Sequence, residues 1–339
     1  MVLLNCLNNE KSLIIALGAI ALVACTKTSV SYEQTGEIGF APVVRKNSTK
    51  AVVQGVLFEP SWSIRVFGYY DRSVGKGNEY TAGKFTESYL DGVEFTKKTD
   101  GSTWTGKEHS YYWPKTGSLL FAGYAPAGFA GVTHDLATNK FSVVEFNQPD
   151  FSATTDLLYA GYGKSVLGEN VPMTFAHALS WITVRAKADA NIKVKITNIE
   201  IQGVAEKGSS TALPEWTTKG TKTLSVYAPS EADIKVLASA DTKVESNPDC
   251  GLVFPQTLTD AAIIKVSYKM DRGDGTFVEQ NPFTKKLNEL KSGSDFVGKW
   301  VAGSHYTYNI IFGAAAEIEI EPGVTAWTSV PVENISATN

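Results

Sequence analysis

The residue with the clearest chemistry is Cys25, which ends the run Leu22-Val-Ala-Cys. A cation at Lys11 precedes an apolar stretch from Leu13 to Ala24, so a small residue stands directly before the thiol. This layout is typical of a secretory signal that ends at a lipidated cysteine. The stretch is shorter than the roughly 20 apolar residues that a membrane-spanning helix needs. The sequence therefore predicts export and acylation of Cys25, and the alternative is a short buried helix with a chance cysteine.

The first 36 residues divide into two predicted parts. Residues 1–24 form a lipoprotein signal peptide, and residues 25–36 form a flexible tether because they are polar and short of large apolar groups. Glu10 and several asparagines suit a basic n-region poorly. We expect translation to start nearer Lys11. The alternative is that residues 1–10 come from an error of sequencing or of the gene model and are never translated. The folded body is expected to begin near Glu37.

No other residue pattern indicates catalysis or a bound cofactor. The histidines show no HxxxH or HExxH spacing, and neither a GxSxG motif nor a phosphate-binding glycine loop occurs. Paired carboxylates for glycoside hydrolysis are brought together only by the fold, so the sequence neither proposes nor excludes them. His177 lies in an apolar strand and is expected to be a hydrogen-bonded core histidine. We predict no metal site, no cofactor and no enzymatic activity.

The segment from Asp271 to Thr276 predicts a hairpin, because Asp274-Gly275 separates two strand-like runs. It also contains Arg-Gly-Asp, a tripeptide that some cell-surface receptors bind, but the turn accounts for it. Cys250 has no partner in the chain after Cys25, so no disulfide is expected. It is interpreted as a turn or strand-edge thiol.

Composition excludes one class of partner. The chain has 339 residues, of which 43 % are hydrophobic and 19 % charged, and its formal net charge is −4. No basic stretch suited to nucleic acid occurs. The length suffices for one large or two ordinary cores, and we predict two domains.

The apolar residues mostly alternate with polar ones, which indicates strands in antiparallel sandwiches. The clearest alternating runs are residues 180–186, 192–201, 224–227, 263–268, 306–312 and 317–321. The helical signal is thin and allows a turn or two within 152–160 and 284–291, and surface loops are expected at 72–83 and 205–220. The alternation becomes denser after Asn170-Val-Pro172, so we place one domain at residues 37–171 and the other at residues 172–339.

Several stretches together resemble one family. His109 to Pro126 is similar to a Tyr-Trp-Pro segment that leads into an apolar strand and a Tyr-x-Pro turn, and Met173 to Val184 is similar to a Phe-x-His-x-Leu-Ser strand. Both patterns are found in the fimbrillin-like (Mfa-like) lipoproteins of Bacteroidales. The stretches Trp300 to Ile310 and Ile318 to Trp327 resemble later parts of the same family.

The resemblance implies two tandem transthyretin-like antiparallel β-sandwich domains and a type V pilus subunit located in the fimbrium at the outer membrane. In this family a trypsin-like protease removes the first strand together with the lipid, and the opened groove accepts a strand from the next subunit. The matching segment runs from Glu37 to Val44 and on to Ser48-Thr-Lys-Ala51. This match places the cut after Lys50, whereas an arginine-specific protease would cut after Arg45.

The implied partners are other pilus subunits, the outer membrane through the lipid on Cys25, and surface ligands of host or bacterial cells. The tail carries Val330, Val332 and Ile335 as candidates for the donated strand. The alternative is a last edge strand, which suits Pro331. The basic residues before residue 51 favour a cleaved subunit over an anchor, and stalk and tip both remain open.

Two rival functions are also compatible with these residues. A glycan-binding surface lipoprotein would use exposed tryptophans, such as Trp104, Trp113 or Trp216, as platforms for sugar rings, although tryptophan also fills sandwich cores. A surface hydrolase has no supporting motif.

Overall fold

The computed structural model describes residues 36–44, 63–73, 84–98, 103–151, 155–163, 169–189, 192–237, 244–245, 251–271, 273–313 and 318–326. In these residues no α-helix occurs, and single-turn 3-10 helices lie at η2 (Glu231–Asp233) and η3 (Leu287–Glu289). Nothing helical within the described ranges is long and apolar enough to cross a membrane. The prediction of an all-β fold is confirmed.

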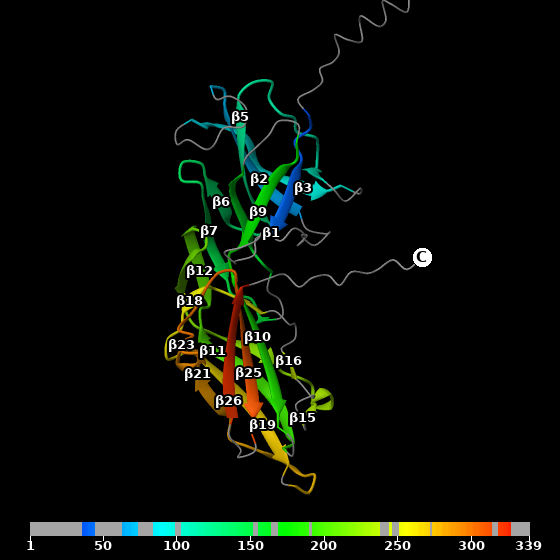
Figure 1. Cartoon of the computed structure of the whole chain (residues 1–339), viewed down its shortest axis with the longest axis vertical. Coiled ribbons are helices and arrows are strands. Elements are labelled where there is room, and N and C mark those ends of the chain that lie inside the picture. The colour runs from blue at the N-terminus through cyan, green and yellow to red at the C-terminus, as the bar shows by residue number, and fades with distance from the viewer. Residues whose placement is uncertain are drawn as a thin grey trace, which may run out of the picture.

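Strands of the first half close into a ring in the order β1-β4-β3-β2-β5-β8-β9 (Figure 1). Their bounds are β1 (Phe40–Val44), β2 (Ser63–Asp71), β3 (Glu87–Lys97), β4 (Trp104–Gly106), β5 (Ser118–Ala125), β8 (Leu158–Gly163) and β9 (Val171–His177). The ring encloses an apolar core that includes Phe95, Phe121 and Phe175, all 0 % exposed.

A second apolar layer covers the outside of this ring. Along β5 the residues alternate between the inner core, which takes Leu119 and Phe121, and an outer cluster, which takes Leu120 and Tyr124. Every residue of β5 is therefore buried. This explains why its sequence is a continuous apolar run without alternation.

The outer layer is a sheet that both halves of the chain build, in the order β13-β12-β7-β6. Its bounds are β6 (Val132–Asp135), β7 (Lys140–Asn147), β12 (Lys207–Ala212) and β13 (Glu215–Lys219). The loop expected at residues 205–220 is thus wrong, because this segment is a hairpin paired to β7. Gly208 permits the pairing, since a Cβ there would lie 2.5 Å from the ring of Phe254.

The second half packs two sheets against one core. One sheet holds β10 (Ser180–Ala188), β16 (Val244–Glu245), β17 (Gly251–Val253), β25 (Ser304–Phe312) and β26 (Ile318–Ala326). The facing sheet holds β11 (Val194–Val204), β14 (Lys222–Tyr227), β15 (Val236–Leu237), β19 (Ile263–Asp271), β20 (Phe277–Glu279) and β21 (Phe283–Lys286). Short ladders pair β18 (Gln256–Thr257) with β24 (Lys299–Trp300), and β22 (Lys291–Ser292) with β23 (Asp295–Phe296).

The strands expected from alternation all form, and the hairpin at Asp274-Gly275 joins β19 to β20. Of the two segments considered for a turn or two of helix, only residues 284–291 contain a helical turn among the residues that the structure describes. Leu158 to Ala160 belong to β8, and residues 284–291 form strand and a single 3-10 turn. Strand pairing determines the structure of residues 158–160, because β8 lies between β5 and β9 in the ring.

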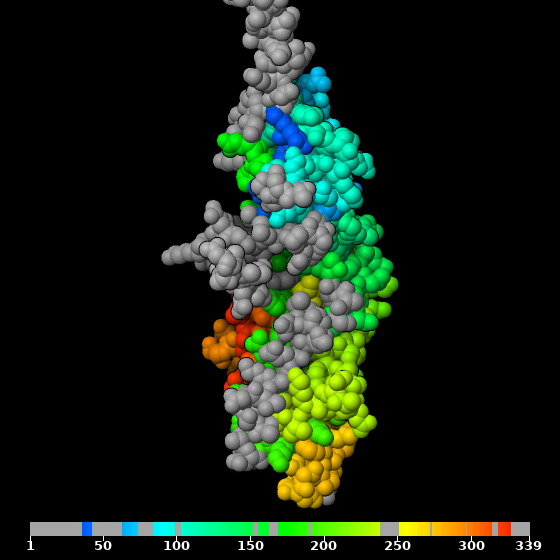
Figure 2. Space-filling view, turned by 90° about the vertical axis from the view of Figure 1, so that its right-hand side faces the viewer, coloured from blue at the N-terminus to red at the C-terminus, as the bar shows by residue number. Residues whose placement is uncertain are grey.

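The molecule is elongated, with the first half at one end and the second half at the other (Figures 1 and 2). The predicted division between residues 171 and 172 falls at the first residue of β9, and β9 pairs with β1 and β8 of the ring. The first buried strand of the second half is β10, which starts at Ser180.

Candidate functional site

The site begins with β1, the first strand that the structure describes. It pairs in parallel with β9 from Phe40 opposite Val171 to Val44 opposite Phe175, and it meets β4 where Phe40 faces Trp104. Parallel neighbours are never joined by a tight hairpin. β1 is therefore held by strands distant in sequence, and Figure 2 shows its residues, in blue, reaching the surface between other parts of the first half.

Backbone hydrogen bonds also hold the residues that lead into β1, on the side of β9 and on the side of the segment from Tyr111 to Trp113. The Val171 amide donates to the Gly39 carbonyl at 2.8 Å, and the Ile38 amide donates to the Tyr111 carbonyl at 2.7 Å. The Trp113 amide donates to the Gly36 carbonyl at 3.2 Å. Residues 36–39 thus extend the contact of β1 along a second segment, Tyr111 to Trp113.

Two side chains anchor this strand in the core. Ile38 and Phe40 are both 0 % exposed. The ring of Phe40 meets Phe95 edge-on at 4.8 Å and Phe121 edge-on at 5.1 Å between centroids. Without β1, the core would have an apolar slot open to solvent. The edges of β4 and β9 that face β1 would then be unpaired.

Charge adds a weaker tether in front of β1. The Glu37 carboxylate accepts from the Lys98 ammonium at 3.1 Å and from the Ser110 hydroxyl at 2.8 Å. These groups are partly exposed, so the ion pair adds little to stability. Its main effect is to orient the residues that lead into β1.

Gly39 lies under a bridge of two side chains. The Asn170 side-chain amide donates to the Thr103 hydroxyl at 3.2 Å. A Cβ on residue 39 would lie 2.5 Å from Asn170 Oδ1 and 2.6 Å from Thr103 Cγ2. Sequence reasoning missed both residues, because nothing marks two ordinary polar residues that lie more than sixty positions from Gly39.

The residues predicted for lipidation, processing and strand donation all lie outside the described residues. They are Cys25, Arg45, Lys50, Val330, Val332 and Ile335. β1 ends at Val44, directly before Arg45, and β26 ends at Ala326, shortly before the candidate donor residues. Cys250 and Arg272 also fall outside the described residues.

None of the three tryptophans suggested as platforms for sugar rings is an exposed residue. Trp104 and Trp113 are 4 % and 5 % exposed and line the core of the ring. Trp216 is partly buried, and its indole N–H donates to the Ala178 carbonyl at 2.7 Å. These three residues give the glycan-binding alternative no support.

His177 and His305 both pack within the fold. His177 is buried at the end of β9 with Nδ1 2.7 Å from Asp156 Oδ2, as expected of a core histidine. His305 stacks on Trp181 at 3.8 Å, and burial, followed by the charge of Arg185, lowers the pKa of His305 to about 4. In the described ranges no three His, Cys, Asp or Glu side chains could together hold a metal ion.

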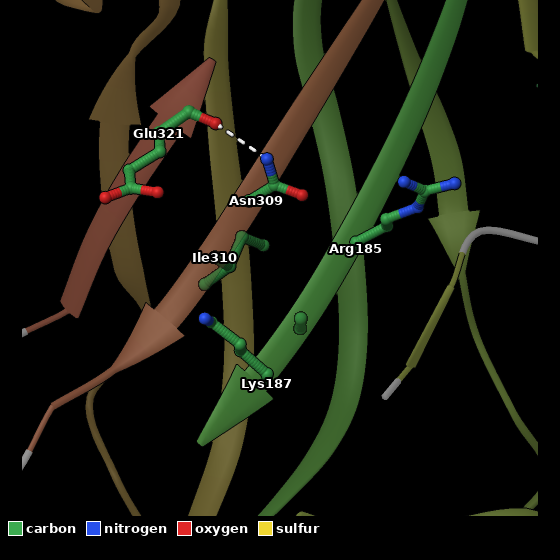
Figure 3. Close-up of a pocket in the computed structure, with 6 residues that line it drawn as sticks. Arg185, Lys187, Asn309, Ile310 and Glu321 are labelled. Carbon is green, nitrogen blue, oxygen red and sulfur yellow. Dashed lines mark hydrogen bonds between the residues drawn. The ribbon is translucent and has the colours of Figure 1, made fainter. Parts of the chain in front are cut away.

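A pocket of about 250 Å³ lies on the outer face of the β10–β25–β26 sheet (Figure 3). Arg185 and Lys187 line it from β10, and Asn309 and Glu321 line it from β25 and β26. The Asn309 side chain donates to the Glu321 carbonyl at 3.3 Å. The lining mixes two cations with a carboxylate and includes no thiol, hydroxyl or imidazole, and we assign this pocket no function.

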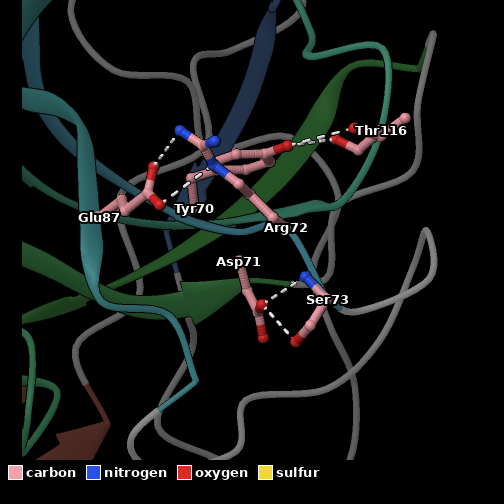
Figure 4. A network of polar contacts seen from close by, with 6 residues as sticks. All are labelled: Tyr70, Asp71, Arg72, Ser73, Glu87 and Thr116. Atoms are coloured by element: carbon pink, nitrogen blue, oxygen red, sulfur yellow. Dashed lines mark hydrogen bonds and ion pairs between the residues drawn. The ribbon is translucent and has the colours of Figure 1, made fainter.

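The end of β2 carries a polar network (Figure 4). Asp71 accepts from the amide and the hydroxyl of Ser73, at 2.8 and 2.7 Å, which turns the chain at the strand end. The Arg72–Glu87 ion pair is mostly exposed and contributes little. We interpret this network as a strand terminus and assign it no binding function.

The ring and the second sandwich define an all-β protein in which β1, the first strand described, is held in the ring by non-local pairing. The model of the fimbrillin-like family matches residues 49–327. The chain belongs to the fimbrillin-like family, as its motifs suggested.

Solved structures share this fold. A fimbrial protein of Bacteroides vulgatus matches with a TM-score of 0.54 and 13 % identity, over 86 % of this chain and 100 % of that one. A proposed cell adhesion protein of Bacteroides ovatus matches with a TM-score of 0.53 and 15 % identity, over 87 % and 99 %. One of Bacteroides uniformis gives 0.51 and 16 %, over 86 % and 99 %. No curated protein sequence matches the chain.

Proposed function

We propose that this chain is a structural, non-enzymatic subunit of a surface fimbrium that enters the polymer by strand exchange. In this proposal the chain is exported as a lipoprotein, acylated on Cys25 and carried to the outer membrane. A protease then cuts after Lys50 or Arg45, and β1 leaves with the lipid. Membership of the fimbrillin-like family supports this proposal, as do the fimbrial protein and the cell adhesion protein that share the fold.

One observation carries it: β1 stands at the start of the described fold, so a single cut after it would separate it from the chain, and the other six ring strands would remain joined in one sheet. Its neighbours β4 and β9 stay joined to the ring through β3 and β8. A cut within residues 45–50 separates β1 from the rest of the folded chain. The strand is then held by non-covalent contacts, chiefly its hydrogen bonds and the burial of Ile38 and Phe40.

The physical chemistry favours refilling of the slot. An empty slot exposes unpaired backbone groups on β4 and β9 and the aromatic wall of Phe95 and Phe121. A strand from another subunit restores the hydrogen bonds and the burial together. On the donor side, the tail with Val330, Val332 and Ile335 is proposed to enter the slot of a neighbouring subunit.

The test is trypsin digestion of protein that starts at Thr26, which retains every described residue. We expect cleavage confined to residues 45–50, followed by slow uptake of a fluorescent peptide with the sequence of residues 36–44. The matched control replaces Arg45, Lys46 and Lys50 with glutamine, and it should resist this cut and exclude the peptide.

Mass mapping of the cut termini and size-exclusion chromatography provide the readout. Uptake of peptide only after the cut supports strand exchange. A cut protein that never exchanges its β1, or a segment 45–50 that trypsin cannot reach, would overturn the proposal and favour an anchor subunit or a glycan-binding lipoprotein.

A further inference from the structure

The space above Gly39 restricts which strand can occupy the slot. We infer that Thr103 and Asn170 make the slot selective for a strand of another subunit type with glycine between two large apolar residues. This inference rests on the proposed strand exchange and adds the identity of the preferred occupant. The template is Ile38-Gly39-Phe40, whose three residues are all buried.

Gly39 is required for space and not for backbone conformation. Its φ lies outside the left-handed region that favours glycine. The obstacle to a side chain is the bridge from Asn170 to Thr103, which comes within 2.6 Å of where a Cβ would be. Contacts under about 3 Å are not tolerated, and both atoms lie closer than that, so both side chains have to move.

Neither movement is free of cost. Turning Asn170 away breaks its 3.2 Å hydrogen bond to the Thr103 hydroxyl. Thr103 is β-branched, and such side chains have few low-energy rotamers. Asn170 also directly precedes Val171, whose amide bonds the Gly39 carbonyl. A shift here therefore disturbs the hydrogen bond that sets the register of the occupant.

The tail of this chain does not meet the requirement. Val330 and Val332 have the same spacing as Ile38 and Phe40, so they are the pair that could fill both apolar positions. In either strand direction, Pro331 then takes the place of Gly39. Proline adds ring atoms under the bridge and lacks an amide hydrogen. A second copy of this chain is thus a poor donor in this register, and the preferred donor is a different subunit.

The test measures binding of labelled peptides to the trypsin-cut protein that starts at Thr26. The parent peptide has the sequence of residues 36–44, and its variant carries Gly39→Ala. We expect the alanine peptide to bind about tenfold more weakly, from a lost hydrogen bond and local strain. Alanine is otherwise preferred to glycine in a strand, so the expected order opposes the intrinsic preference. A peptide with Ala41→Gly controls for backbone flexibility.

A matched protein variant removes the bridge. With Thr103→Ser and Asn170→Ala together, the alanine peptide should bind at least as tightly as the parent peptide. The tail peptide, residues 327–339, should bind the unchanged protein about tenfold more weakly than the parent peptide, and Pro331→Gly should recover part of that loss.

The outcomes separate the two proposals. If the cut protein binds no parent peptide, the strand-exchange proposal fails and takes this inference with it. If it binds the parent and alanine peptides equally, or the tail as tightly as the parent, strand exchange stands and the selectivity inference is overturned. Equal loss of alanine binding in the Thr103→Ser and Asn170→Ala protein also overturns it.

Discussion

Replacing Phe40 with alanine tests whether β1 is integral to the first core. The side chain is 0 % exposed and meets Phe95 and Phe121 edge-on at 4.8 and 5.1 Å. Truncating a buried phenylalanine costs about 3–5 kcal/mol, and each aromatic pair accounts for about 0.5–1.5 kcal/mol of such a loss. With two such pairs and no exposure, we expect about 4 kcal/mol for Phe40→Ala in the uncut protein.

The same number predicts a second result in the cut protein, where β1 is a separate peptide. A loss of about 4 kcal/mol corresponds to roughly a thousandfold weaker hold on the strand. Urea unfolding measures the first quantity, and competition between labelled peptides with and without Phe40→Ala measures the second. Hydrogen exchange should show the loss of protection concentrated in β4 and β9.

Phe312→Ala is the matched control, because Phe312 is 2 % exposed and packs on Tyr268 in the other core. It should lower overall stability by a similar amount but leave peptide binding unchanged. The reasoning is refuted if Phe40→Ala costs under about 1 kcal/mol, well below the range for a buried phenylalanine, or if both variants weaken peptide binding equally.

Three further predictions concern other parts of the fold. As the pH falls from about 6.5 towards about 4, the unfolded chain protonates at His305 before the folded chain does, so stability falls. His305→Asn should flatten this decline in urea midpoint, and an unchanged decline would contradict the reasoning. Gly208→Ala drives a methyl into Phe254 and should cost about 1–3 kcal/mol by urea unfolding, whereas a neutral result would mean that the hairpin is loosely packed. Trp216→Phe removes an indole hydrogen bond and should cost about 1 kcal/mol in the same assay; no loss would show that this bond contributes nothing.

The sequence could predict the class of fold because a strand with one buried face shows its period of two directly. Residues 180–186 and 306–312 alternate clearly, and both form strands, β10 and β25. What the alternation could not show is that these strands pair with each other in parallel, from Trp181 opposite His305 onward. Pairing across more than a hundred residues depends on the whole topology.

Composition led to a wrong prediction for a segment that is stabilised by pairing with a neighbouring strand. The segment 205–220 is rich in glycine, serine and threonine, which is typical of a loop. It forms a hairpin because β12 pairs with the edge of β7. Gly208, which has no side chain, leaves room for the ring of Phe254. In the same way, residues 158–160 resemble part of a helix but lie between two ring strands.

For the candidate site, local sequence patterns predict the order of the parts: a lipoprotein signal before Cys25, an apolar strand, and basic residues directly after that strand. These are local patterns, legible without knowing what lies near them in space. The tertiary structure decided the rest. Only the fold brings Thr103 and Asn170 over Gly39 and places Phe40 against two aromatic rings, because close packing joins residues that no local spacing relates.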